Sequence, residues 1–301
     1  MNTILKKLMK KGIAKGESQI LSATEMKELE NLILKSKDKH RKEGEVSLNI
    51  IGIDKRIDEL LEKILANPEV KNTLEIVLGS NFLIRQIFAR FNEPDDKGLA
   101  LHQDAIGEAG LMVLVNDQPD GSTVFLPGSQ LIPSDKHLAQ KVSWSSLKLI
   151  NITKYFLLPA VGNAGTHYYF LHRTWHGRTP GKSNKTKISI FFDMFPVSSK
   201  SKEYFDTTSN VYENEYNSMI DWEFVTQPNL KKMISRNRYR NNVEIFEKTN
   251  DTKYSLSMKA SKYEQIFKNN LYFIYVILKV ALLEILFFPI TIKRLFKKFK
   301  S

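Results

Sequence analysis

The sequence predicts a mainly β fold, an antiparallel barrel or sandwich with helices packed outside it. Up to about residue 75, apolar residues recur at helical spacing, whereas the chain that follows consists of short runs of β-branched and aromatic residues. Turn-forming sequences rich in Pro, Gly, Asn and Asp separate several of these runs. Helices followed by many short strands favour an antiparallel β core with helices around it.

Size and composition limit the protein to one sizeable globular domain with extensions. The chain has 301 residues, of which 42% are hydrophobic and 26% are charged, an ordinary composition for a globular protein. It contains no cysteine, which excludes disulfides, thiolate metal sites and cysteine nucleophiles. The N-terminus has no long apolar run and no small-residue cleavage site, so we predict no signal peptide and expect the main body in the cytoplasm.

Two helices are specified in the first part of the chain. The first follows Ser22 and Glu25, which have the spacing of a capping box, and its apolar residues recur at helical intervals. The second covers residues 54–66, and Asn67-Pro68 ends it. We therefore expect a helical N-terminal region over residues 1–75.

Short strands are specified in the part of the chain that follows, over residues 76–200. They are rich in β-branched and aromatic residues, and the predicted segments are 82–91, 111–115, 123–126, 168–171 and 188–195. Residues 201–262 are polar and predict an irregular extension. Residues 263–301 form a hydrophobic and basic tail.

Two histidines and an aspartate carry the strongest chemical signal. His102 and Asp104 are two residues apart, so on a strand their side chains converge on one side. A distant histidine would complete the two-His-one-carboxylate triad, which is typical of non-haem Fe(II) oxygenases and leaves positions open for a co-substrate and dioxygen. His176, at a predicted strand-to-turn junction, is the candidate. Alone, a His-Xaa-Asp pair is more often two polar residues on a solvated strand.

Three motifs in sequence order resemble the phytanoyl-CoA dioxygenase family of Fe(II)/2-oxoglutarate-dependent oxygenases. They are His102-Gln103-Asp104, the segment 121–129 ending in Pro-Gly-Ser, and the segment 173–177 with His176. The resemblance covers roughly residues 82–196 and implies a jelly-roll (cupin-like, double-stranded β-helix) core. It also implies that His102, Asp104 and His176 bind Fe(II). The implied reaction consumes 2-oxoglutarate and O2, releases succinate and CO2, and hydroxylates a C–H bond of a small or lipid-linked metabolite. Because the carboxylate ligand is present, hydroxylation is favoured over halogenation.

The residue expected to bind the far carboxylate of 2-oxoglutarate departs from the family. Lys187 stands eleven residues after His176, where the family usually has an arginine. A lysine supplies a point charge instead of a bidentate fork. Lys185, on the same strand face, is the competing anchor, and Gln86 on an earlier strand is a further candidate for the co-substrate. Gln130 stands where the family has a histidine that is not an iron ligand.

The C-terminal tail predicts association with a membrane. Residues 271–292 are long enough to span a bilayer but include Lys279 and Glu284, and basic residues flank them on both sides. A single span cannot keep both basic flanks in the cytoplasm. We therefore expect a helix in the interface of an anionic membrane, at its inner face, with spanning or packing on the barrel as alternatives. Nucleic-acid binding is disfavoured, because long aliphatic residues interrupt the basic ones.

Two other functions remain compatible with the sequence. One is a non-catalytic jelly-roll binding module held at a membrane by the tail. The other is a basic adaptor in which the tail is the whole function. The intact His102, Asp104 and His176 favour the oxygenase, whereas Lys187 in place of arginine favours the binding module.

Overall fold

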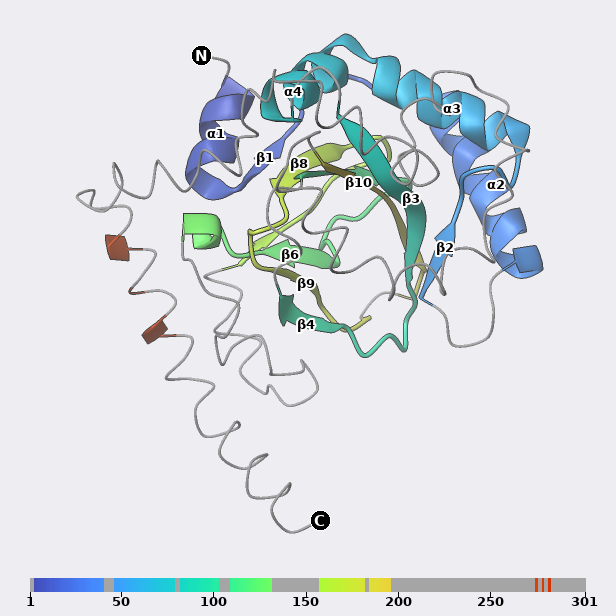
Figure 1. The fold of residues 1–301 in the computed structure, drawn as a ribbon. Helices are drawn as coiled ribbons and strands as arrows, with labels where there is room; N and C mark the ends of the chain where they lie inside the picture. The colour runs from blue at the N-terminus through green and yellow to red at the C-terminus, as the bar shows by residue number, and fades with distance from the viewer. Residues whose placement is uncertain are drawn as a thin grey trace, which may run out of the picture.

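Two antiparallel sheets face each other, and helices lie over the larger one (Figure 1). The computed structural model describes residues 3–40, 46–78, 82–102, 109–131, 157–181 and 184–195, together with the helical residues 274, 275, 278, 281 and 282. A double sheet with outer helices is a jelly-roll core with flanking helices, so the predicted fold class is confirmed.

The strands divide unequally between the two sheets. The described strands are β1 (Ile13–Lys15), β2 (Ser47–Asn49), β3 (Leu83–Asn92), β4 (Leu99–His102), β5 (Ala109–Leu114), β6 (Thr123–Phe125), β7 (Leu158–Pro159), β8 (His167–Leu171), β9 (His176–Arg178) and β10 (Lys187–Phe195). Among them, β1-β8-β5-β10-β3-β2 form a six-stranded sheet and β4-β9-β6-β7 a four-stranded one. The five strands expected from the sequence are present as β3, β5, β6, β8 and β10.

The structure contains both helices that the sequence specifies, and further helices beside them. They are α1 (Thr3–Lys11), α2 (Ala23–His40), α3 (Lys55–Ala66), α4 (Pro68–Leu78) and the 3-10 turn η1 (Ser129–Leu131). Before α2, the Glu25 N–H donates to Ser22 Oγ at 3.3 Å and the Ser22 N–H donates to the Glu25 carboxylate at 2.9 Å. These reciprocal bonds are the predicted capping box. The Asp54 side chain caps α3, and Asn67 ends it.

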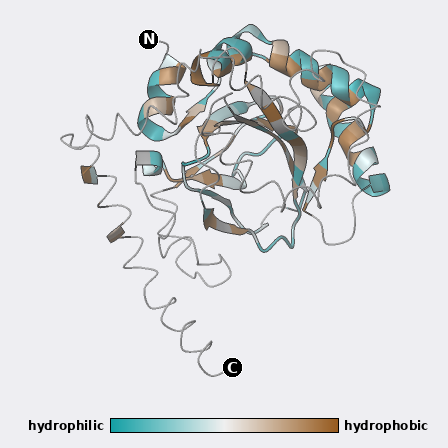
Figure 2. Cartoon of the chain, viewed as in Figure 1, coloured by the Kyte–Doolittle hydropathy of each residue, from teal (hydrophilic) through white to brown (hydrophobic). Residues whose placement is uncertain are grey.

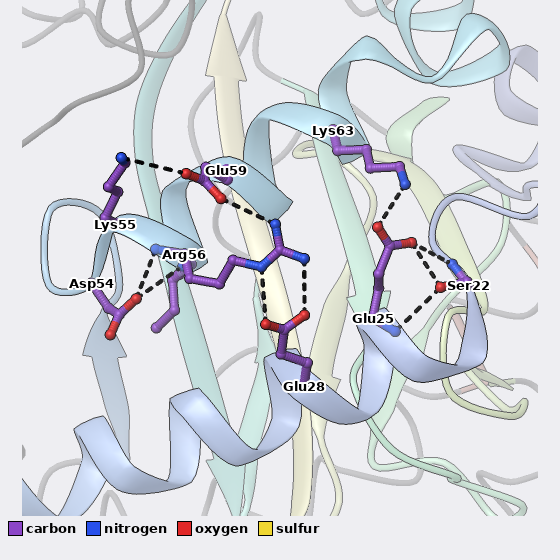
Figure 3. Close-up of polar contacts among 9 residues, drawn as sticks. Ser22, Glu25, Glu28, Asp54, Lys55, Arg56, Glu59 and Lys63 are labelled. Carbon is purple, nitrogen blue, oxygen red and sulfur yellow. Dashed lines mark hydrogen bonds and ion pairs between the residues drawn. The ribbon is translucent and has the colours of Figure 1, made fainter.

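Charged pairs join α2 to α3 along their outer surfaces (Figure 3). The Arg56 guanidinium donates to both carboxylate oxygens of Glu28, at 2.9 and 3.0 Å. Lys63 Nζ lies 2.6 Å from the Glu25 carboxylate. Since exposed ion pairs add little stability, these contacts align the two helices more than they hold them to the sheet.

The two faces of the larger sheet contact different partners. On β10, Ile188, Ile190 and Phe192 point outward into a core shared with the helices. Phe191, between them in sequence, points inward into a second core between the two sheets. Figure 2 shows the brown apolar residues distributed along both the strands and the helices. The alternation follows from the two-residue period of a strand, and each fully buried aliphatic residue stabilises the fold by about 1.5–3 kcal/mol.

Residues 1–75 are not wholly helical, which corrects the sequence expectation. β1 pairs with β8, opposing Ile13 to Phe170, and β2 pairs with β3, opposing Leu48 to Ala89. Strands of three residues are too short to show a two-residue period, so the sequence pattern could not reveal them. They extend both edges of the larger sheet.

The predicted tail lies almost entirely outside the described residues. Four of its described helical side chains, Ile274, Tyr275, Leu278 and Leu282, are 41–63% exposed. Within the part of the chain that the structure describes, no helix has both the length and the apolar character needed to cross a membrane.

Candidate metal and co-substrate site

Two of the predicted ligands, His102 and His176, lie side by side. β4 and β9 pair in the smaller sheet so that His102 at the end of β4 opposes His176 at the start of β9. The centroids of the two imidazole rings are 4.4 Å apart, and the ring planes meet at 50°. The fold therefore brings together two histidines that are far apart in the sequence.

A backbone carbonyl selects the tautomer of His176. Nδ1 of this ring lies 2.9 Å from the carbonyl oxygen of Thr174. A carbonyl can only accept, so Nδ1 carries the proton when the ring is neutral. The lone pair is then on Nε2, and a histidine with this hydrogen-bonding pattern is prepared to bind a metal.

Aromatic rings enclose His176 on the inner side of the barrel. Its ring centroid lies 5.5 Å from that of Phe170 and 5.9 Å from that of Phe125. The His176 residue is only 7% exposed. These rings remove water from one side of the imidazole and fix its orientation.

The Pro-Gly-Ser turn fixes the backbone before His176. Ser129 Oγ accepts a hydrogen bond from the Trp175 N–H at 2.8 Å and donates to the Leu126 carbonyl at 2.6 Å. The Leu126 N–H in turn donates to the Trp175 carbonyl at 2.8 Å. Trp175 is 0% exposed and packs in the interior. This motif therefore has a positioning role under the distal histidine.

The N-terminal helix supports the same turn. Gln130 is fully buried, and its Nε2 donates to the carbonyls of Met9 and Lys10 at 3.1 and 3.2 Å. These carbonyls lie in the last turn of α1, where no further helical N–H group follows to donate to them. Thr174 Oγ1 donates to the Gly12 carbonyl at 2.9 Å. Gln130 thus caps the C-terminal end of α1.

Lys187, the predicted anchor of 2-oxoglutarate, points into the barrel. It is 5% exposed and occupies the same face of β10 as Phe191. Its Nζ donates to the Gly121 carbonyl at 3.0 Å and forms an ion pair with Asp120 Oδ1 at 2.6 Å. The Asp120 side chain is 55% exposed. The cation is therefore buried, whereas its carboxylate partner is half in solvent.

The other two predicted co-substrate residues lie elsewhere. Lys185 is exposed and precedes β10. Gln86 shares the inner face of β3 with Phe88, and its amide contacts Asp193 instead of Lys187. Arg90, on the same face, opposes Ser189 of β10 and lies over the Phe88 ring at 5.3 Å. Gln86 and Arg90 thus both lie on the inner face of β3.

The third predicted ligand, Asp104, lies outside the described residues. Among those that are described, no group of three or more His, Asp or Glu residues could hold a metal ion. His102 and His176 therefore supply two imidazole donors, and the carboxylate stays a prediction from the His-Xaa-Asp sequence. Two imidazoles on paired strands fit a divalent transition metal.

Solved structures of other proteins share this fold. HygX from Streptomyces hygroscopicus with nickel and 2-oxoglutarate bound aligns with a TM-score of 0.53 at 10% identity, over 65% of this chain and 87% of HygX. HygX with nickel, 2-oxoglutarate and hygromycin B bound aligns with a TM-score of 0.52 at 10% identity, with the same coverage. The non-heme monooxygenase ThoJ aligns with a TM-score of 0.50 at 15% identity, over 64% of this chain and 77% of ThoJ.

These likenesses show a common jelly-roll fold. No protein-family model and no curated protein sequence matches the chain, so membership of the phytanoyl-CoA dioxygenase family stays a prediction.

Sequence reasoning missed two acidic residues that contact the predicted co-substrate residues. Asp120 pairs with Lys187, and Asp193 contacts Gln86. Asp193 could have been found, because it lies an even number of residues after Lys187 on one strand and so shares its face. Asp120 could not, since it lies in a turn whose position depends on the tertiary fold.

Proposed function

We propose that this chain is an Fe(II)- and 2-oxoglutarate-dependent dioxygenase that hydroxylates a C–H bond. The observation that carries the proposal is the contact between His102 and His176 inside a jelly roll, with their ring centroids 4.4 Å apart. The fixed tautomer of His176 supports it, because Nε2 is left as a metal donor. The fold shared with HygX, which was solved with nickel and 2-oxoglutarate, supports the same function.

His102 and His176 would hold the metal together with Asp104. Iron with its co-substrate and dioxygen would supply the oxidising power that no side chain of this chain has. The protein's own part is orientation: the Thr174 carbonyl fixes the His176 ring, and Phe125 and Phe170 keep water from its inner side. A dry, rigid wall favours reaction with a bound substrate over side reactions.

Lys187 would bind the far carboxylate of 2-oxoglutarate. Its ammonium group is buried, and a buried cation requires a counter-ion. The co-substrate carboxylate would replace Asp120, whose half-exposed side chain can turn into solvent. Lys185 is exposed and lies before the strand, which makes it the weaker candidate.

The test is anaerobic binding of Fe(II) and 2-oxoglutarate to the full chain, followed by the visible charge-transfer band of chelated 2-oxoglutarate. We expect the band in the wild-type protein and none in His176→Ala. His167→Gln is the matched control, since His167 is also buried but bonds Glu69 on the outer face, at 3.0 Å. A band that persists in His176→Ala, or one that is missing from the folded wild-type protein, would contradict the proposal.

A second candidate is a non-catalytic jelly-roll module at an anionic membrane surface. The observation that favours it is the exposure of Ile274, Leu278 and Leu282, which are spaced by four residues and so share one helix face. Basic residues follow in the sequence at 293–300, as expected for contact with anionic headgroups. A folded protein that binds anionic vesicles but gives no charge-transfer band would favour this module over the oxygenase.

A further inference from the structure

A buried ion pair between Asp96 and Arg178 lies where β4 begins and β9 ends. Arg178 Nη2 donates to Asp96 Oδ1 at 3.0 Å, and Arg178 Nε lies 2.9 Å from Asp96 Oδ2. The Asp96 and Arg178 side chains are only 6% and 8% exposed. A buried ion pair is often no more stabilising than apolar side chains of similar size, so this pair calls for a further explanation.

Asp96 joins the turn before β4 to β9 and to the chain that follows β9. Its Oδ1 also accepts the Gly98 N–H at 2.6 Å, and its backbone carbonyl accepts the Gly181 N–H at 2.8 Å. Gly98 has a φ of +77°, and a Cβ there would lie 2.5 Å from the Arg178 carbonyl oxygen, so this close approach requires glycine. The start of β4 is therefore fixed against the end of β9.

The pairing of β4 with β9 is irregular between this ion pair and the two histidines. Leu99 opposes Arg178, and His102 opposes His176, with a register shift between the two pairs. The interval is three residues along β4 but two residues along β9. The β4 strand therefore contains one extra residue in this interval, as in a β-bulge.

The extra residue decides to which face of the sheet His102 points. Regular pairing that starts from Leu99 and Arg178 would set Leu101 opposite His176. His102 would then lie one position further along β4 and point to the other face, because side chains alternate along a strand. With the shift, the centroid of its ring instead lies 4.4 Å from that of the His176 ring. The contact between the two histidines thus depends on the register that begins at Asp96 and Arg178.

We propose that Asp96 and Arg178 are positioning residues of the metal site, because they hold the register that places His102 beside His176. The inference rests on the proposed function, in which these two histidines bind the metal. The pair acts through the backbone: its two parallel contacts fix the angle as well as the distance between the ends of β4 and β9. A lysine in place of Arg178 would supply the charge without this fork.

The experiment removes the ion pair without leaving a buried charge. In the double variant Asp96→Asn/Arg178→Met both side chains are neutral, so we expect it to fold, with a circular dichroism spectrum like that of the wild type. Histidine-labelled, metal-free full chain is then studied by NMR. Nuclear Overhauser contacts between the rings of His102 and His176 should appear in the wild type and be lost in the double variant. Affinity for Ni(II), measured by calorimetry, should fall about 10- to 100-fold.

Two further variants separate geometry from charge and from general stability. Arg178→Lys keeps the cation but not the bidentate contact, so the ring contacts should weaken and Ni(II) affinity should still fall about tenfold. Glu28→Gln/Arg56→Met is the matched control, because it replaces the bidentate pair between α2 and α3 in the same way. This control should leave the ring contacts and the Ni(II) affinity unchanged.

Ring contacts that persist in the folded double variant, or a Ni(II) affinity equal to that of the wild type, would overturn the positioning role. If the double variant does not fold, the same two measurements on Arg178→Lys decide the question. The outcome is separable from that of the proposed function, because the ring contacts need neither metal nor 2-oxoglutarate. Ring contacts that depend on the pair, without a charge-transfer band in the wild type, would retain the positioning role and reject the oxygenase. A band together with ring contacts that do not depend on the pair would do the reverse.

Discussion

The two faces of the six-stranded sheet are both buried, yet their side chains serve different purposes. On β10, the outward residues Ile188, Ile190 and Phe192 are all apolar and pack against the helices. The inward residues include Lys187 and Asp193, which are buried beside Phe191. A stable fold alone would favour apolar residues on both faces, because buried charges cost free energy. We therefore expect the inner face to serve the function proposed above, and the outer face to contribute mainly to stability.

The largest difference in stability is expected between alanine variants of Phe191 and Phe192, which are adjacent on β10 and point to opposite faces of the sheet. Phe192→Ala opens a cavity in the closed outer core and should lower the free energy of unfolding by about 3–5 kcal/mol. Phe191→Ala should cost less, because Phe191 is 9% exposed whereas Phe192 is 0% exposed, and water or a ligand can fill the space. Urea unfolding followed by circular dichroism gives both values. Equal losses in the two variants would remove the distinction between the faces.

The second difference concerns the binding of 2-oxoglutarate by Lys187, the first residue of β10, and by Lys185, which precedes the strand. Lys187→Met should weaken 2-oxoglutarate binding about 10- to 100-fold, because hydrogen bonds to charged groups contribute about 1.5–3 kcal/mol. Lys185→Met should change it little, since Lys185 is exposed. Titration of the charge-transfer band with 2-oxoglutarate measures both.

A substitution of Asp120, the ion-pair partner of Lys187, should have the opposite effect on 2-oxoglutarate binding. Asp120→Asn removes the carboxylate that competes for Lys187, so binding of 2-oxoglutarate should tighten, by up to about fivefold for a partly exposed pair. A loss of affinity in Asp120→Asn would instead make the aspartate part of the binding site and reject the exchange of counter-ions.

The sequence predicted most of the outer face and less of the inner one. The capping box of Ser22 and Glu25 and the β-branched and aromatic run along β10 are local signals, which is why those elements were found. The contact of His102 with His176 depends on strand pairing, so the sequence could suggest it only through a motif. Asp120 was missed because a turn brings it to Lys187, and the contact of Asp193 with Gln86 was missed because it joins two neighbouring strands.

A buried aspartate of the helical layer, Asp58, extends the comparison to titration. Asp58 lies in α3 at 0% exposure; its Oδ1 accepts the Gly52 N–H at 3.0 Å, whereas Oδ2 has no hydrogen-bond partner among the described residues. Burial, reinforced by the nearby Asp54 carboxylate, raises the pKa of Asp58 to about 6. The folded state therefore holds this proton more tightly than the unfolded state, where the pKa is about 3.9. The resulting stabilisation is complete below that value and is lost as pH rises through about 6.

Asp58→Asn removes this pH dependence, because an amide stays neutral and its oxygen can still accept the Gly52 N–H. At pH 8 we expect the free energy of unfolding to rise by up to about 3 kcal/mol, the value of two pKa units, and at pH 4 to stay nearly unchanged. Urea unfolding at the two pH values measures the difference. A gain of equal size at both would show that the charge on Asp58 is not its cause. A gain only at pH 8 would show that the charge on this carboxylate costs the helical layer stability.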